Sequence, residues 1–249
     1  MTRILSALAA IVTAGALSAC GGDPESAGPS VSASSPTPST TAPSTPPATS
    51  STTPSSKPTT TVRTKAELTR ALLDRRDLPA GFTVEPDEPG DGGGLDLTSK
   101  DPRCAALVRL LKTDTAPGSK ATVSRSLSRG QQPPFIDESL DAMGSAGAVA
   151  TLQTSFRAAV AYCPKVNLTI AGQGTSSMSV RKVTAPQEGT GPFAVRLTAA
   201  GGALNGLVVT MVSTGVDDVV LAMAFIATAP ADIAGATRLA VDKTERVLI

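Results

Sequence analysis

An abrupt change of composition near residue 62 decides how much of this chain can fold. Residues 21–62 consist almost entirely of Ser, Thr, Pro, Ala and Gly, and their only charged side chains are Asp23, Glu25 and Lys57. Such a segment buries too little apolar surface to offset the conformational entropy that it would lose on ordering. We therefore interpret residues 20–62 as a disordered stalk, and we expect one globular domain over residues 63–249, which is long enough to build its own core.

The segment before the stalk has the features of an export signal. Arg3 is an early cation, and the apolar run that follows it, residues 4–17, is shorter than the ~20 residues that span a membrane. The run ends in Leu17-Ser18-Ala19-Cys20, which resembles the bacterial lipobox at all four positions. An uncleaved membrane anchor is the alternative interpretation of this segment.

The lipobox resemblance implies a processed lipoprotein. Residues 1–19 would be a signal peptide, and Cys20 would become the first residue of the mature protein and carry acyl chains such as palmitate. Because each buried CH₂ contributes about 0.8 kcal/mol, two or three chains give firm anchoring. We expect the protein on the extracytoplasmic face of the cell membrane, with the lipid as its membrane partner.

The absence of histidine excludes most familiar catalytic machinery. Ser-His-Asp and Cys-His systems need an imidazole as the base, and zinc sites commonly use it as a ligand. A net charge of +1 without a basic cluster argues against nucleic-acid binding, and an aromatic content of 2% argues against stacking surfaces for bases or sugars. We expect a protein that is not an enzyme and uses no metal or cofactor.

The first part of the folded region predicts two helices and a short strand. Thr64 and Glu67 form a capping-box pattern, which predicts a helix that runs to about Arg75. A short strand is expected over residues 82–85. Asp101 followed by proline then predicts the N-cap and first turn of a second helix.

Two alternating segments on either side of Gln131-Gln132 predict a β-hairpin. With the turn centred there, apolar pairs and one pair of opposite charges fall into a single register. Arg125 and Glu138 each interrupt an apolar strand face, and two interpretations of them stay open. They form a structural ion pair at the sheet edge, or they line a cleft and bind a polar group of a ligand. The pairs in this register are Val123 with Leu140, Leu127 with Ile136, and Arg125 with Glu138.

The remaining sequence predicts an α+β fold. A helix is expected from about Ser145 to Tyr162, and a last helix begins at Pro230. Between them lie strand patterns, of which the last two are apolar on both faces, as in central strands, and are separated by a turn over residues 215–218. We expect an antiparallel sheet of about five to seven strands packed against helices. The later strand patterns are residues 166–170, 178–183, 194–198, 207–212 and 219–226.

Two cysteines remain once Cys20 is assigned to lipid. Cys104 and Cys163 lie in an exported domain, and their even number favours a disulfide. Closing a loop of about 60 residues contributes roughly 4 kcal/mol in the chain-entropy model. A redox or metal role is the weaker alternative, because the two cysteines are far apart in sequence and no histidine can join them.

The order of motifs in the folded region resembles a known family. The motifs are Leu72-Leu73 with Asp77-Leu78-Pro79-Ala80-Gly81-Phe82, the early cysteine in Arg103-Cys104-Ala105, and the helix ending Ala159-Val160-Ala161-Tyr162-Cys163. With the closing strand-strand-helix they resemble the extracellular sensor domain of PknH-type serine/threonine kinases and related actinobacterial lipoproteins. The resemblance implies an α+β domain with an antiparallel sheet and a cleft suited to a ligand. The kinase sensors carry two disulfides and this chain can form one, so no binding residue is transferred.

Two classes of function remain for such a domain. One is a cell-envelope lipoprotein that binds or senses a small ligand, of which a lipid carrier is a variant. The other is a module that binds a partner protein of the envelope and has no small-molecule ligand.

Overall fold

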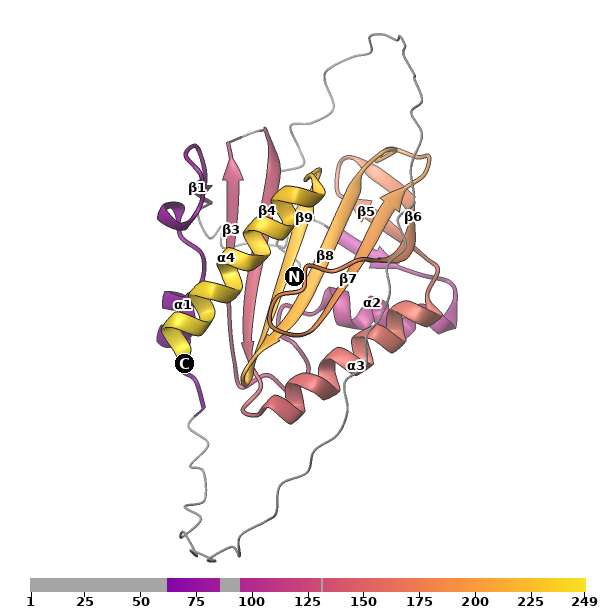
Figure 1. Cartoon of the computed structure of the whole chain (residues 1–249). Coiled ribbons are helices and arrows are strands. Elements are labelled where there is room, and N and C mark those ends of the chain that lie inside the picture. The colour runs from indigo at the N-terminus through magenta and orange to yellow at the C-terminus, as the bar shows by residue number, and fades with distance from the viewer. Residues whose placement is uncertain (1–61, 86–94, 131) are drawn as a thin grey trace, which may run out of the picture. The chain divides into compact units, whose positions relative to one another are not determined.

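The computed structural model describes residues 62–85, 95–130 and 132–249, and these form an α+β structure (Figure 1). The predictions for the signal peptide, Cys20 and nearly all of the stalk lie outside the described residues. The helices are α1 (Lys65–Ala71), α2 (Ala105–Lys112), α3 (Ala146–Tyr162) and α4 (Pro230–Leu248), with 3₁₀ turns η2 (Arg75–Asp77) and η3 (Pro102–Cys104). The strands are β1 (Thr83–Val84), β2 (Leu95–Thr98), β3 (Ala121–Arg129), β4 (Gln132–Ala142), β5 (Lys165–Ile170), β6 (Gly174–Val183), β7 (Thr190–Ala199), β8 (Val208–Val216) and β9 (Val219–Ile226).

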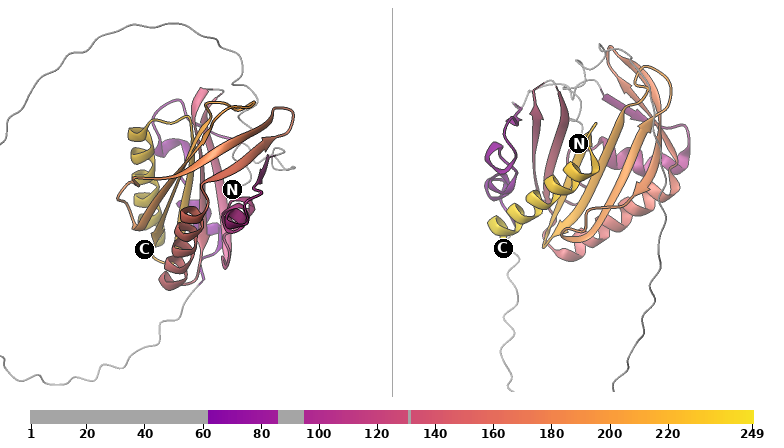
Figure 2. Two further views of the ribbon diagram at one scale, coloured as in Figure 1. Left: turned by 90° about the vertical axis from the view of Figure 1, so that its right-hand side faces the viewer. Right: turned by 45° about the horizontal axis from the view of Figure 1, so that its top comes forward.

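All nine strands belong to one antiparallel sheet in the order β1-β3-β4-β9-β8-β7-β6-β5-β2. The α4 face of the sheet is covered by α1 and α4, and the α3 face is covered by α2 and α3 (Figure 2). β9 shows why two layers form. Leu221 and Phe225 pack on the α4 face, whereas Ala224 and Ile226 pack on the α3 face, so both sides of this central strand are buried.

The strand count corrects our expectation of about five to seven. The additional strands are two short edge strands. The segment of β1 was expected as a short strand over residues 82–85, whereas β2 was not expected. β2 alternates apolar and polar residues, but it has only four residues and follows a glycine-rich segment, so it is too short to be recognised as a strand from the sequence. It becomes a strand by pairing with β5, which lies about 70 residues later in the chain.

The predicted hairpin register is confirmed. β3 and β4 pair Val123 with Leu140, Leu127 with Ile136 and Arg125 with Glu138. The register was predictable because a shift by one residue would place every apolar side chain of the strand on the opposite face.

The first helix is shorter than expected and ends at Ala71 rather than near Arg75. The capping box between Thr64 and Glu67 is present at its start. At its end, Leu72 has an extended backbone (φ −62°, ψ 145°), and the chain turns toward the sheet before η2. Leu73 is hydrogen-bonded to two strand side chains, and these contacts replace the helical ones.

The turn between β8 and β9 is shorter than expected. β8 extends to Val216, so only Asp217 and Asp218 form the loop, and Asp217 has a positive φ of 52°. Asp tolerates this conformation in tight hairpins. Gly215 lies within the strand, where a Cβ atom would lie 2.7 Å from Cγ1 of Val149 on α3. Glycine at this position therefore permits the close approach of the helix.

Candidate functional site

The edge of the sheet at β3 is only partly covered by β1. β1 pairs with two of the nine residues of β3, and the N–H of Glu85 adds one hydrogen bond to the carbonyl of Ser126 (2.9 Å). In an antiparallel strand the N–H and C=O of one residue point to the same side, and this side alternates along the chain. The N–H and C=O of Ser124 and Thr122 therefore point to the open side, where no described strand pairs with them.

A cavity of about 630 Å³ lies along this open stretch of β3. It lies between α1, β1, β3 and residues 114–115, which follow α2. Its volume falls in the range of roughly 300–1,000 Å³ that is typical of small-molecule sites. The cavity therefore has the size of a ligand site and offers unpaired backbone groups along one wall.

The two sides of the cavity differ in chemistry because side chains of β3 alternate between faces. On the α4 face the wall is formed by Leu72, Val123 and Arg125. On the α3 face the wall carries the carboxylates of Glu85 and Asp114. Glu85 accepts hydrogen bonds from the hydroxyls of Ser128 and Thr83, so it is held in place beside the strand.

Two smaller hollows of about 50 and 40 Å³ continue from this cavity along the α3 face. Asp114 borders all three spaces, and Ser139 and Ala222 form the floor between the two hollows. These hollows exist because the floor side chains are small and α3 packs farther along the sheet, against β6 to β9. Hollows of this size hold a few water molecules and extend the polar surface inward from the cavity.

The carboxylates on the floor are already hydrogen-bonded. Asp141 accepts from the N–H of Ala116 (3.1 Å) and from the hydroxyl of Thr122 (2.5 Å). Asp137 accepts from the hydroxyl of Ser126 (2.5 Å). The contact with Ala116 fixes the segment after α2 against β4, and the two hydroxyl contacts join β3 to β4.

Arg125 and Glu138 lie opposite each other on the α4 face, but no hydrogen bond or ion pair between described atoms joins them. Both bind the backbone of Leu73 instead. The Leu73 N–H donates to Oε2 of Glu138 (2.7 Å), and Nη1 of Arg125 donates to the Leu73 carbonyl (2.8 Å). The two strand side chains therefore satisfy the backbone of a residue that has left α1.

The buried position of Glu138 raises its pKa to about 7. Removal from water is the largest cause, and the hydrogen bond from Leu73 and the charges of Arg125 and Lys243 oppose it. Only 1% of the residue is exposed, and its Oε1 has no hydrogen-bond partner. Arg125 is half-buried and lines the cavity, so of the two residues it is the one within reach of a ligand there.

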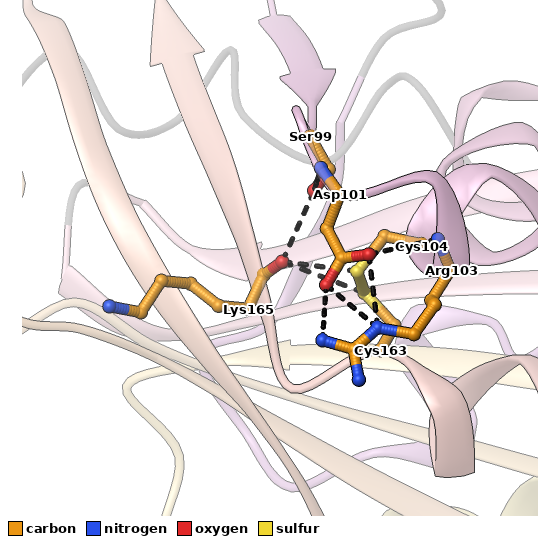
Figure 3. The surroundings of a disulfide bond; sticks show 6 residues. All are labelled: Ser99, Asp101, Arg103, Cys104, Cys163 and Lys165. Atoms are coloured by element: carbon orange, nitrogen blue, oxygen red, sulfur yellow. Dashed lines mark hydrogen bonds and ion pairs between the residues drawn. A yellow bond between two sulfur atoms is a disulfide. The ribbon is translucent and has the colours of Figure 1, made fainter.

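The disulfide Cys104–Cys163 is present (Figure 3), and neither cysteine lines the cavity. It joins η3 to the end of α3, and both sulfur atoms lie near the carbonyl oxygen of Lys165, at 3.3 and 3.6 Å. Beside it, Asp101 caps the N–H of Arg103 and also binds its guanidinium. The hydrogen bonds from Arg103 lower the pKa of Asp101. The disulfide therefore fixes the helices of the α3 face.

The described residues offer neither a metal site nor a membrane-spanning helix. Within the part of the chain that the structure describes, no three His, Cys, Asp or Glu side chains gather so that they could hold a metal ion. Among the same residues, no helix is long and apolar enough to cross a membrane.

Comparison with known proteins supports the fold. No protein-family model and no curated protein matches the chain. The crystal structure of the extracellular domain of PknH from Mycobacterium tuberculosis matches with a TM-score of 0.51 and 14% identity, over 75% of this chain and 97% of that chain. A putative uncharacterized protein from Mycobacterium smegmatis matches with a TM-score of 0.38 and 10% identity, over 73% and 97% of the two chains. The chain shares the fold of the PknH extracellular domain, as its order of motifs implied.

Sequence reasoning missed the open edge of β3 and the role of Asp114. An unpaired edge depends on where β1 ends, and β1 contributes only two residues. Asp114 follows α2 without any motif around it. Its position beside β3 and β4 is a result of tertiary packing, so the sequence alone carried no signal for it.

Proposed function

We propose that this chain is an extracytoplasmic lipoprotein of the cell membrane, tethered through Cys20, whose non-catalytic, sensor-like domain binds a ligand in the β3-edge cavity. The cavity of about 630 Å³ beside unpaired strand groups is the observation that carries this proposal. The shared fold with an extracellular domain supports the location. The lipobox resemblance of residues 17–20 supports the anchor.

Arg125 is the residue that we assign to ligand orientation. Among the described contacts, only its Nη1 donates a hydrogen bond, which leaves guanidinium N–H groups for a carboxylate or carbonyl of the ligand. Glu138 acts on the ligand indirectly, as a positioning residue, because it holds Leu73 and Leu73 holds Arg125.

The test is native mass spectrometry of full-length protein purified in detergent from its own host. We expect a bound species that is released when the protein is denatured. The Arg125→Lys variant keeps the charge and one donor toward Leu73 but cannot bind a ligand group in the bidentate geometry of a guanidinium. The amount of bound species that it retains should therefore be lower by at least about tenfold.

A substitution outside the cavity controls for loss of the ligand during purification. Val62 is exposed and lies outside the cavity, so Val62→Ala should retain the ligand at the level of the parent. An empty domain in every preparation would count against a co-purifying ligand. If the Arg125→Lys variant retains as much ligand as the parent, Arg125 does not bind the ligand.

A partner protein is the second candidate for the occupant of this cavity. The unpaired backbone of Ser124 and Thr122 favours it, because extended polypeptide is the ligand that such groups bind best.

A further inference from the structure

Residues 121–125 of β3 form a strand edge with little protection against pairing. Natural sheets protect their edges with charged side chains, proline, bulges or a covering element. The one charged side chain of this stretch, Arg125, donates to the Leu73 carbonyl. The stretch contains no proline, the irregularity in β3 lies farther along at Ser128/Arg129, and no described strand pairs with its open side. Ser124 is exposed at its centre.

We propose that this edge binds an extended segment of another protein, which adds to the sheet as a strand beside β3. The proposal rests on the proposed function, because the segment is the ligand of the same cavity. It names the class of that ligand as polypeptide. The backbone of the segment would pair with the N–H and C=O of Ser124 and Thr122, in line with β1.

The walls of the cavity define the side chains that the segment should carry. If the segment runs in the same chain direction as β1, its successive residues would lie opposite Arg125, Ser124, Val123 and Thr122. Those opposite Ser124 and Thr122 would point to the α3 face, toward the carboxylates of Glu85 and Asp114, which favours lysine or arginine. Those opposite Arg125 and Val123 would point to the α4 face, which favours an acidic residue and then an apolar one.

The residues that follow β1 in the sequence are poorly suited to pair with this edge. In the register of β1, residue 87 would lie opposite Ser124 and residue 89 opposite Thr122. Residue 89 is proline and has no N–H to donate, so the chain could complete only one of the two pairs. A segment from elsewhere can complete both, and its charges can match the two walls.

The probe is the synthetic peptide acetyl-Glu-Lys-Val-Lys-Val-amide, titrated into the full-length protein in detergent and followed by NMR of backbone amides. We expect saturable shifts centred on Thr122 and Ser124. The same peptide with N-methyl groups on both lysine nitrogens lacks the N–H groups that face β3, so its affinity should fall at least about tenfold. Exchanging the positions of its charges, to Lys-Glu-Val-Glu-Val, should have a similar effect.

Two variants at one position test the backbone contact from the side of the protein. Ser124→Pro removes the outward N–H, but it leaves the ladder with β4 intact because that N–H points to the open side. Ser124→Ala keeps the N–H and is the matched control. We expect at least about tenfold weaker peptide binding by the first variant and a change of less than about twofold by the second.

Hydrogen exchange of the free protein separates the possible occupants. If the amides of Ser124 and Thr122 exchange rapidly until the peptide is added, the edge is open and the proposal is supported. Slow exchange in the free monomer would assign the edge to the chain itself, and a dimer abolished by Ser124→Pro would assign it to a second copy. Either result would overturn the proposal.

Failure of the peptide alone would not remove the proposed function. If the N-methylated and unmethylated peptides bind equally, strand addition is wrong. A small molecule retained in native mass spectra through Arg125 would still support a ligand site in the cavity.

Discussion

At the scale of single residues, Leu73 is where α1 is attached to the sheet. Its N–H and carbonyl are bound by Glu138 and Arg125, which lie opposite each other on neighbouring strands. The two side chains are not interchangeable, because one accepts and the other donates. Their charges matter less than the backbone groups that they satisfy, since an unsatisfied buried group costs about 1–3 kcal/mol.

The raised pKa of Glu138 predicts a specific dependence of stability on pH. Its pKa is about 7 in the folded protein and 4.5 as the reference value, so between these values the folded state keeps a proton that the unfolded chain has lost. The free energy of unfolding therefore falls as pH rises through this window, by at most about 3 kcal/mol from this group.

Glu138→Gln removes the titration and keeps an oxygen for the Leu73 N–H. Urea denaturation at pH 5, 6, 7 and 8 should show the parent losing stability relative to this variant as pH rises. The comparison cancels the contributions of all other groups, including Asp77. A parent that gains stability relative to the variant with rising pH would mean that Glu138 is ionised and stabilised by Arg125.

At the scale of elements, the molecule is held by contacts between segments far apart in sequence. Lys243 on α4 binds Asp77 at the end of η2 (2.5 Å). Burial opposes ionisation of Asp77, but the hydrogen bonds from Lys243 and from the N–H of Asp74 lower its pKa. Arg63, just before α1, binds Asp217 and Asp218 in the β8–β9 turn. The first and last parts of the described chain are thus joined on the α4 face.

The disulfide provides the corresponding connection on the α3 face. Cys104 and Cys163 are separated by 59 residues, so the double Cys→Ala variant should lower the free energy of unfolding by about 4 kcal/mol in the chain-entropy model. Reduced parent protein is the control, because it retains the buried sulfur atoms and loses only the covalent bond. A loss below about 1 kcal/mol in both would show that the unfolded chain is not restricted by this bond.

At the scale of the whole molecule, the proposed anchor determines where the domain can act. In the proposal, the folded part is attached to the membrane through the lipid on Cys20, at the far end of the stalk over residues 20–62. The ligand or partner must then be present outside the cytoplasm and within reach of the stalk.

The lipid anchor can be tested by a single substitution. Cys20→Ala should abolish incorporation of a palmitate analogue and leave the signal peptide uncleaved, as judged by the mass of the product. The parent should incorporate the label and enter the detergent phase on partitioning. Equal labelling and an identical mass for parent and variant would refute the assignment of Cys20.

Local patterns accounted for much of the fold. The capping box of Thr64 and Glu67, the start of α3 at Ser145 and the β3–β4 register all involve residues close together in the chain. Their physical causes are side-chain period, capping geometry and cross-strand pairing, which can be evaluated without the rest of the molecule. The disulfide was predicted by counting alone, since only one pair was available.

The sequence by itself determined the α+β class, the hairpin register and the cysteine pair, because each follows from periodicity or from the number of residues available. Only the tertiary structure decided the position of β2 beside β5, the contact of Glu138 with Leu73 across 65 residues, and the cavity at β3. Those features depend on where one strand stops and on which distant segments meet. No local sequence pattern predicts such contacts, because they form only when the sheet and its helices are assembled.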